Sequence, residues 1–270
     1  MRAFLRAVLT LATLLLPGAG AAAVGEPLVF GVLNQQSPTL TAERWNPMLE
    51  YVGRRSGVAL KLAMGATVEL TNEMMGRGEF DFVFTNHSFK PEYDRLGLKV
   101  MARWGWEPVR AAIAVAADSK LTRLSELHGR SVVFPSRFAF FGYAVPSVAL
   151  RAAGVDVDES FAANQDGALA QLRAGRADAA AVSSRFLEEY VERKGAAFRT
   201  IYLSQPFPDL AVLAHPRLPA ATVEAVRRTL VGMTEDAEAR AVLAGADCPG
   251  FTDAGEEDYA GVRAVYRQDR

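Results

Sequence analysis

Two distant stretches of the chain repeat one pattern, in which the end of a helix is followed by Gly-x-x-Asp and then by an apolar strand. The first copy occupies residues 78–84 and the second residues 175–182. Polar residues follow both strands, Thr85-Asn86-His87 in the first copy and Ser183-Ser184 in the second. Ligands of open α/β sheets bind beyond the carboxyl ends of strands. The repeat therefore predicts two similar lobes that share a cleft, unless it reflects only the general likeness of two αβ units.

The segments between and around these copies alternate between strand and helix patterns. Trp45, Met48, Leu49 and Val52 are spaced i, i+3, i+4, i+7, which predicts a helix with one buried face. Pro47 lies inside this pattern, so the helix either begins near it or bends there. The alternation predicts an α/β protein in which each lobe is a mostly parallel sheet flanked by helices. The expected strands are 28–33, 58–64, 80–84, 111–116, 131–134, 177–182, 200–203 and 211–214.

The first residues of the chain have the pattern of an export signal. Arg2 and Arg6 precede an apolar run over 7–16, Pro17-Gly18 breaks the run, and small residues follow at 19–23. This order predicts a signal peptide over residues 1–23 and a periplasmic protein. A membrane anchor is the alternative, but the run is shorter than the ~20 residues that a membrane-spanning helix needs.

Composition excludes several classes of function. Cys248 is the only cysteine, so no intrachain disulfide can form and core burial must stabilise the exported chain. The formal net charge is −1 and the basic residues are scattered, so no nucleic-acid partner is expected. His87, His128 and His215 lack metal-ligand spacing, and no catalytic motif is present. We expect no metal, no cofactor and no enzymatic activity. Cys248 is either an incidental buried residue or a reactive thiol.

Five segments, taken in order, resemble the periplasmic phosphate/phosphite/phosphonate-binding family, whose members are solute-binding components of ABC importers. The resemblance implies a type II periplasmic-binding fold with two lobes joined by a two-strand hinge. Lobe I would comprise 26–115 and 207–270, and lobe II 116–206. The chain would cross the hinge near 111–118 and 204–209. The matching segments are 28–38, 44–52, 78–84, 124–134 and 142–146.

The family's anion-binding turn is altered in this chain. In relatives it resembles Ser-Thr-Ser-Gly-Tyr, with hydroxyl groups on the oxyanion, whereas here the matching residues are Ala139-Phe140-Phe141-Gly142-Tyr143. Backbone amides at the start of the following helix can still bind an anion. Each hydrogen bond lost to a charged group removes roughly 1.5–3 kcal/mol. A ligand with an apolar or aromatic part, or a neutral ligand, is therefore favoured over a tightly bound phosphonate. Phe140 and Phe141 face either the cleft or the core.

Polar residues at other strand and helix ends complete the expected site. Asn86 could instead cap a helix and His87 could be exposed, and Trp104 could pack between the lobes or contact ligand. The candidate ligand-binding residues are Gln35, Gln36, Ser37, Thr85, Asn86, His87, Ser136, Phe140, Phe141, Gly142, Tyr143, Gln165 and Ser183.

The expected function is capture of a small ligand by closure of the lobes around it. The ligand would be a phosphonate- or phosphite-like oxyanion or a related small molecule, and a monomeric protein would deliver it to an ABC transporter permease. In an alternative, the closed form presents the ligand to the periplasmic domain of a sensor kinase. An enzyme on the same fold is the least favoured hypothesis.

Overall fold

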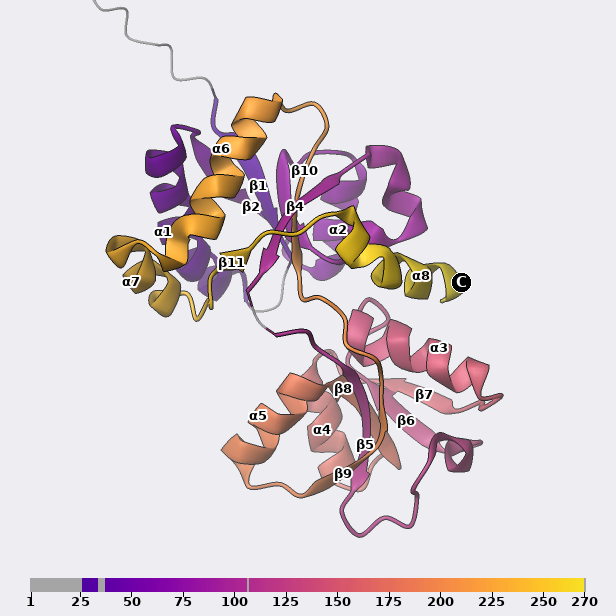
Figure 1. Cartoon of the computed structure of the whole chain (residues 1–270). Coiled ribbons are helices and arrows are strands. Elements are labelled where there is room, and N and C mark those ends of the chain that lie inside the picture. Colours follow the sequence, from indigo (N-terminus) through magenta and orange to yellow (C-terminus); the bar gives the residue numbers. More distant parts are fainter. Residues whose placement is uncertain (1–25, 34–36, 106, 270) are drawn as a thin grey trace, which may run out of the picture.

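The computed structural model describes residues 26–33, 37–105 and 107–269, which form two lobes (Figure 1). The expected signal peptide, residues 1–23, lies outside the described residues. None of the helices within the described ranges is long and apolar enough to span a membrane. The predicted two-lobed α/β class is confirmed.

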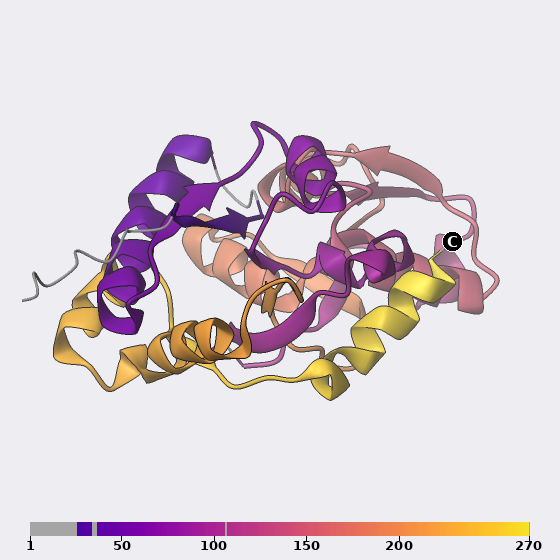
Figure 2. The same ribbon diagram turned by 90° about the horizontal axis from the view of Figure 1, so that it is seen from above.

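The upper lobe in Figure 1, which we call lobe I, has a sheet in the order β11-β4-β10-β3-β1-β2. When the molecule is viewed from above, α1 and α7 lie toward one end and α8 lies toward the other (Figure 2). The elements are β1 (Leu28–Val32), α1 (Pro38–Ser56), β2 (Leu60–Ala63), α2 (Val68–Gly76), β3 (Phe82–Thr85), β4 (Lys99–Trp104), β10 (Ala211–Ala214), α6 (Ala220–Val231), α7 (Ala237–Gly245), β11 (Phe251–Thr252) and α8 (Ala260–Gln268).

The lower lobe, lobe II, has a sheet in the order β7-β6-β8-β5-β9. Its strands are β5 (Ala111–Ala116), β6 (Ser131–Phe134), β7 (Asp158–Phe161), β8 (Ala179–Ser183) and β9 (Phe198–Leu203). Its helices are α3 (Val145–Ala152), α4 (Gln165–Arg173) and α5 (Ser184–Lys194). The helix expected over 121–128 is only a short 3₁₀ turn, Leu124–Leu127.

Both sheets are mixed rather than mostly parallel, and the path of the chain between the lobes explains this. Strand β1 is parallel to β2 and β3, whereas β10 is antiparallel to β3 and β4. In lobe II, β6 is parallel to β7 and β8, whereas β5 is antiparallel to β8 and β9. Strands β10 and β5 each enter a lobe from the crossover. They must therefore run antiparallel to neighbouring strands whose carboxyl ends lie at the crossover.

The two crossing segments pair with each other between the lobes. Val109 and Phe207 exchange two backbone hydrogen bonds of 2.8 Å, which makes the expected two-strand connection. The predicted boundary between residues 115 and 116 falls inside β5, which is nearly all buried and pairs entirely within lobe II. The first crossing therefore lies earlier than 111–118, in the stretch between Trp104 and Ala111.

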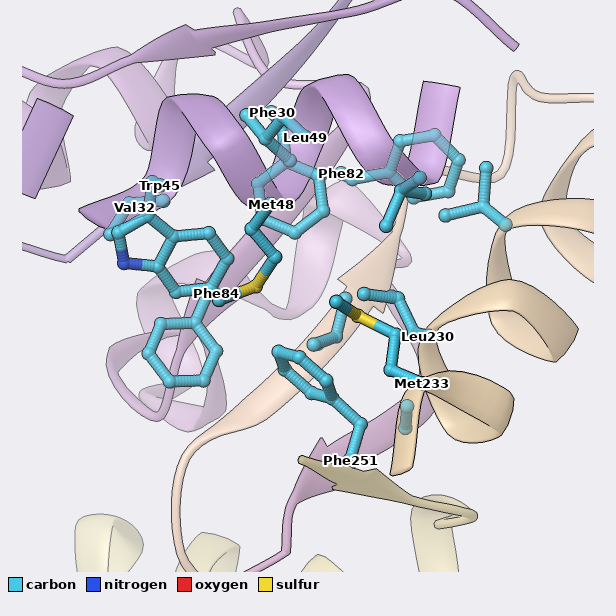
Figure 3. Packing of buried hydrophobic residues seen from close by; sticks show 14 of the residues in the cluster. Phe30, Val32, Trp45, Met48, Leu49, Phe82, Phe84, Leu230, Met233 and Phe251 are labelled. Atoms are coloured by element: carbon cyan, nitrogen blue, oxygen red, sulfur yellow. The ribbon is translucent and has the colours of Figure 1, made fainter. Parts of the chain in front are cut away.

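The predicted buried face of α1 packs on the strands of lobe I. Trp45, Met48, Leu49 and Val52 are all buried, and they face aromatic side chains of β1 and β3 (Figure 3). The Trp45 and Phe84 ring centroids lie 4.8 Å apart. Pro47 is exposed inside a helix that continues from Pro38 to Ser56. The Ser37 side chain begins this helix by accepting a hydrogen bond from the Leu40 N–H.

The repeated Asp of the sequence pattern has the same structural role in both lobes. The Asp81 carboxylate accepts a hydrogen bond of 2.8 Å from the Val29 N–H, and the Asp178 carboxylate accepts one of 3.0 Å from the Ser131 N–H. Each Asp also donates its own N–H to the carbonyl of the same partner. The repeat thus joins the beginnings of neighbouring parallel strands. In lobe I, Arg217 adds an ion pair of 2.8 Å to Asp81.

Candidate ligand-binding cleft

A cavity of about 670 Å³ lies between the lobes, beside the crossover. Residues that follow β1, β3 and β4 or end them form its lobe I wall, among them Leu33, Asn86, His87 and Trp104. Its lobe II wall comes from the turn after β6 and from the first residues of α4 and α5. The lobe II residues include Pro135, Ser136, Phe138, Ala139, Phe140, Phe141, Gly142, Asn164, Gln165, Ser183 and Phe186. The carboxyl ends of the strands therefore meet at a shared gap, as the repeat predicts.

The turn after β6 presents unpaired backbone donors to this cavity. A π-helical turn, Phe140–Ala144, continues directly into α3. The N–H groups of Phe140, Phe141 and Gly142 have no acceptor within the described part of the chain, and all three residues line the cavity. Free N–H groups at the beginning of a helical segment attract negative charge. A Cβ on Gly142 would lie 2.7 Å from the Pro135 ring, so the turn requires glycine here.

Asn86 lines the same cavity from the lobe I side, across from the turn after β6. The residue is only 5 % exposed and lines the cavity, yet its side-chain amide has no hydrogen-bond partner among the residues that the structure describes. The amide is therefore available to form hydrogen bonds within the cavity. A ligand there could take the place of water as its partner.

His87 is buried at the same end of β3 and is held neutral. Burial, together with the nearby Lys90 charge, lowers the pKa of His87 to about 3, and the backbone of Phe138 opposes this shift more weakly. Phe138 belongs to lobe II, and its ring centroid lies 6.5 Å from that of His87. The imidazole thus sits where the two lobes meet.

Asn72 of α2 fixes the orientation of His87. Asn72 Oδ1 lies 3.0 Å from His87 Nδ1 and accepts a hydrogen bond from this ring nitrogen when it carries the proton. The Asn72 amide nitrogen is buried and has no hydrogen-bond partner among the described residues.

The arginines at the cleft already have carboxylate partners. Arg185 lies 2.7 Å from Asp209, Arg193 lies 2.8 Å from Asp166, and Arg44 lies 3.8 Å from Asp247. Glu189 is a fourth carboxylate in the lining. The undescribed residues 34–36 and 106 are Asn, Gln, Gln and Trp, which carry no charge. The lining therefore offers no excess of positive charge to an anion.

Aromatic side chains make up much of the remaining lining. Phe138, Phe141 and Phe186 are half-buried there. Phe140 both lines the cavity and packs into the core, with its ring centroid 5.2 Å from that of Phe207. Trp104 both packs on Phe84, with ring centroids 5.2 Å apart, and lines the cavity, and its contact with a ligand stays a prediction.

Cys248 lies behind Trp104, whose indole N–H donates to Cys248 Sγ over 2.9 Å. Burial raises the pKa of the Cys248 thiol. A raised pKa keeps the thiol protonated, which is the state of an unreactive cysteine.

Most of the predicted site residues, but not all, line the cavity. Asn86, His87, Ser136, Phe140, Phe141, Gly142, Gln165 and Ser183 do so. Gln35 and Gln36 lie outside the described residues. Ser37, Thr85 and Tyr143 are not part of the lining found within the described ranges. Contact of any of them with ligand stays a prediction.

Local bonds explain why these three side chains are turned elsewhere. Ser37 caps α1, and Thr85 Oγ1 accepts a hydrogen bond from the His87 N–H. The Tyr143 ring packs on Phe134, with centroids 5.1 Å apart, and its hydroxyl donates to Glu159. The Tyr143 side chain is therefore engaged within lobe II, and its contact with a ligand stays a prediction.

Sequence reasoning also missed lining residues that begin α5. Arg185 and Phe186 follow the N-cap Ser183, whose side chain accepts a hydrogen bond from the Phe186 N–H. The Ser183-Ser184 pair was a signal for this helix start. The partner of Arg185, Asp209, comes from the crossover and could not be assigned from spacing.

Comparisons with known proteins agree with this architecture. The family model described as "ABC transporter, phosphonate, periplasmic substrate-binding protein" matches residues 30–259. No curated protein sequence matches the chain. XAC2383 from Xanthomonas citri, in a structure bound to ATP, is 18% identical with a TM-score of 0.76, and the match covers 90% of this chain and 96% of that one.

Two further solved structures come from phosphonate-binding proteins. PhnD1 from Prochlorococcus marinus, in complex with methylphosphonate, is 15% identical with a TM-score of 0.75, covering 89% of this chain and 97% of that one. A binding protein component of an ABC phosphonate transporter from Pseudomonas aeruginosa is 16% identical with a TM-score of 0.71, covering 90% and 86%. At these identities the structural matches show the fold alone.

Proposed function

This chain belongs to the family of periplasmic substrate-binding proteins of phosphonate ABC transporters, and from this premise we propose that it captures a small anionic ligand between its lobes. One observation carries the proposal. Unpaired donors from both lobes, the amides of residues 140–142 and the side chain of Asn86, line a single interlobe cavity. A ligand that bonds to both walls binds the closed arrangement more tightly than an open one, and this difference in affinity drives closure.

We further propose where the lobes divide and where the protein works. Lobe I comprises residues 26–108 and 208–269, and lobe II residues 110–206, with the Val109–Phe207 pair as the hinge. Segment 1–23 directs export, and the closed protein presents its ligand to a membrane permease. The family's description as periplasmic and as part of an ABC transporter supports both statements.

The relatives indicate a range of anionic ligands for this fold. XAC2383 has been solved with chloride and with ATP, and the Prochlorococcus protein with methylphosphonate. Their common property is negative charge, which matches the free amides of the turn after β6. We therefore propose an anionic group as the part of the ligand that this turn binds.

A thermal-shift screen of the protein lacking residues 1–23 tests the proposed function. The screen includes phosphate, phosphite, methylphosphonate, sulfonates, other oxyanions and small aromatic acids. A bound ligand at 100 times its Kd stabilises the folded state by about 2.7 kcal/mol. We expect at least one anion to raise the melting temperature in a saturable way. Absence of a shift with every anion, confirmed by calorimetric titration, would contradict a role in anion capture.

Gly142→Ala tests whether the turn after β6 binds the anion. The new methyl group would press on Pro135, so the turn must move and its free N–H groups lose their alignment. We expect affinity for the anion found in the screen to fall by roughly tenfold or more, the equivalent of about one hydrogen bond to a charged group. Gly245→Ala is the matched control, because its added Cβ meets nothing within 4 Å. Equal affinities of the two variants would remove the turn from the site.

A further inference from the structure

We infer that the ligand is a singly charged oxyanion carried on an aromatic or flat apolar body, rather than a small doubly charged phosphonate. The inference rests on the proposed function and names the chemical class that the cleft selects. Three properties of the cleft lead to it: its balance of charge, its aromatic lining with ample volume, and the kind of hydrogen-bond donors that remain free.

The balance of charge disfavours a doubly charged ligand. Three arginines line the cleft and each is paired with a carboxylate, while Glu189 adds one more negative charge. His87 is neutral. A second negative charge on the ligand would find every arginine of the described lining already paired, and it would be repelled by the surrounding carboxylates in a partly desolvated space.

The aromatic lining and the volume fit an extended apolar body. Phe138, Phe141 and Phe186 are half-buried in the cavity wall, and Trp104 adds a fourth ring. Exposed apolar surface in a concave site marks the place of an apolar ligand group. At the ~30 Å³ that one water molecule occupies, the 670 Å³ cavity has room for roughly twenty non-hydrogen atoms. Methylphosphonate fills only a small part of that space.

The free donors suit a single charged group. The N–H groups of residues 140–142 converge from lobe II, and the buried Asn86 amide lies on the opposite wall without a partner. Neutral amide donors hydrogen-bond to a delocalised charge without adding a positive charge of their own. The anionic head would lie between this turn and Asn86, and the apolar body would extend along Phe141 and Phe186.

Four probes separate the effect of charge from that of the apolar body. Methanesulfonate and benzenesulfonate carry one charge, while methylphosphonate and phenylphosphonate carry two near pH 8. Calorimetric titration of the protein lacking residues 1–23 gives the affinity for each. We expect benzenesulfonate to bind tightest, at least about tenfold more tightly than methanesulfonate and than phenylphosphonate. Tighter binding of methylphosphonate than of benzenesulfonate would overturn the inference while leaving the proposed function intact.

Two variants locate the apolar body and the anionic head. Phe141→Ser should reduce the preference for benzenesulfonate over methanesulfonate several-fold, whereas Phe161→Ser, at an exposed ring of β7, should leave that preference unchanged. Asn86→Ala should weaken both sulfonates by a similar factor, since they share a head group. Melting temperatures without ligand verify that each variant is folded. If Phe141→Ser leaves the ratio of benzenesulfonate to methanesulfonate affinity unchanged, the inferred position of the apolar body along Phe141 is overturned.

Failure of the inference and failure of the proposed function give different results. If no probe among the four binds but another anion in the wider screen does, the inferred class is wrong and capture of an anion stands. If no anion binds in either experiment, both are wrong.

Discussion

Between pH 6.5 and pH 4 the free energy of unfolding is expected to fall by roughly 1 kcal/mol for each pH unit because of His87 alone. The pKa of this imidazole is about 3 in the folded protein, against an ordinary value of 6.5, because the ring is buried and Lys90 is nearby. In the unfolded chain His87 takes up a proton below pH 6.5, while in the native protein it stays neutral until about pH 3. The stability that it contributes is complete above pH 6.5 and is lost as the pH falls.

Urea unfolding at several pH values measures this contribution, and two variants isolate it from the titration of other groups. His87→Gln removes the titrating ring, so the slope of stability against pH between 6.5 and 4 should decrease by roughly 1 kcal/mol per pH unit relative to the natural protein. His128→Gln is the control for replacing an exposed imidazole by the same residue. Identical slopes for the natural protein and His87→Gln would show that His87 is accessible to protons in the folded state.

Ligand affinity, like stability, should decrease as the pH falls if closure of the lobes buries His87 against Phe138. The two rings come from different lobes, so the proposed opening of the cleft should separate them and make the imidazole more accessible to a proton. Acid therefore favours the open form, and ligand affinity should decrease as the pH falls below 6.5.

Asp81→Ala is expected to destabilise the protein by about 3 kcal/mol. The Asp81 carboxylate is largely buried, bonds to the Val29 N–H and pairs with Arg217. Removing one partner of a buried ion pair costs roughly 3–5 kcal/mol. Arg217 is 41% exposed, so water can solvate its charge after the change, and the lower end of the range applies.

Asp178→Ala is the comparison, because Asp178 has the same place in the repeat of lobe II without an arginine. It bonds to the N–H and hydroxyl of Ser131, and its loss should cost about 1–3 kcal/mol. Urea unfolding measures the stability of both variants. A double-mutant cycle of Asp81→Ala, Arg217→Ala and Asp81→Ala/Arg217→Ala isolates the energy of the Asp81–Arg217 interaction. A smaller effect for Asp81→Ala than for Asp178→Ala would contradict the proposed ion-pair contribution.

The local patterns of the sequence predicted the layout of the fold well where burial and periodicity agree. The helical face of Trp45, Met48, Leu49 and Val52 is buried as predicted, and the two Gly-x-x-Asp copies occupy equivalent places in the two lobes. Strand β4 was missed because Lys99 and Arg103 interrupt its apolar residues. Helix α5 was missed because most of its residues are polar.

The candidate site was predicted less completely, because its properties depend on contacts between distant segments. The carboxyl ends of the expected strands indicated Asn86, His87 and Ser183 as site residues. The residue that follows a strand in the sequence necessarily lies at the carboxyl end of that strand. The pairing of Arg185 with Asp209 joins α5 to the crossover, and no local spacing encodes it. The direction of the Tyr143 ring depends on packing against Phe134 and Phe161, which only the folded lobe determines.

The most direct test of the central claim measures the distance between the lobes as ligand binds. Fluorescent labels on cysteines introduced at Asn46 of α1 and Glu192 of α5, both exposed, report this distance when Cys248 is replaced by Ala. We expect the labels to move closer together, and the change to saturate at the same concentration of anion as the calorimetric binding curve. A distance that stays constant while the anion saturates the protein would contradict capture by closure of the lobes.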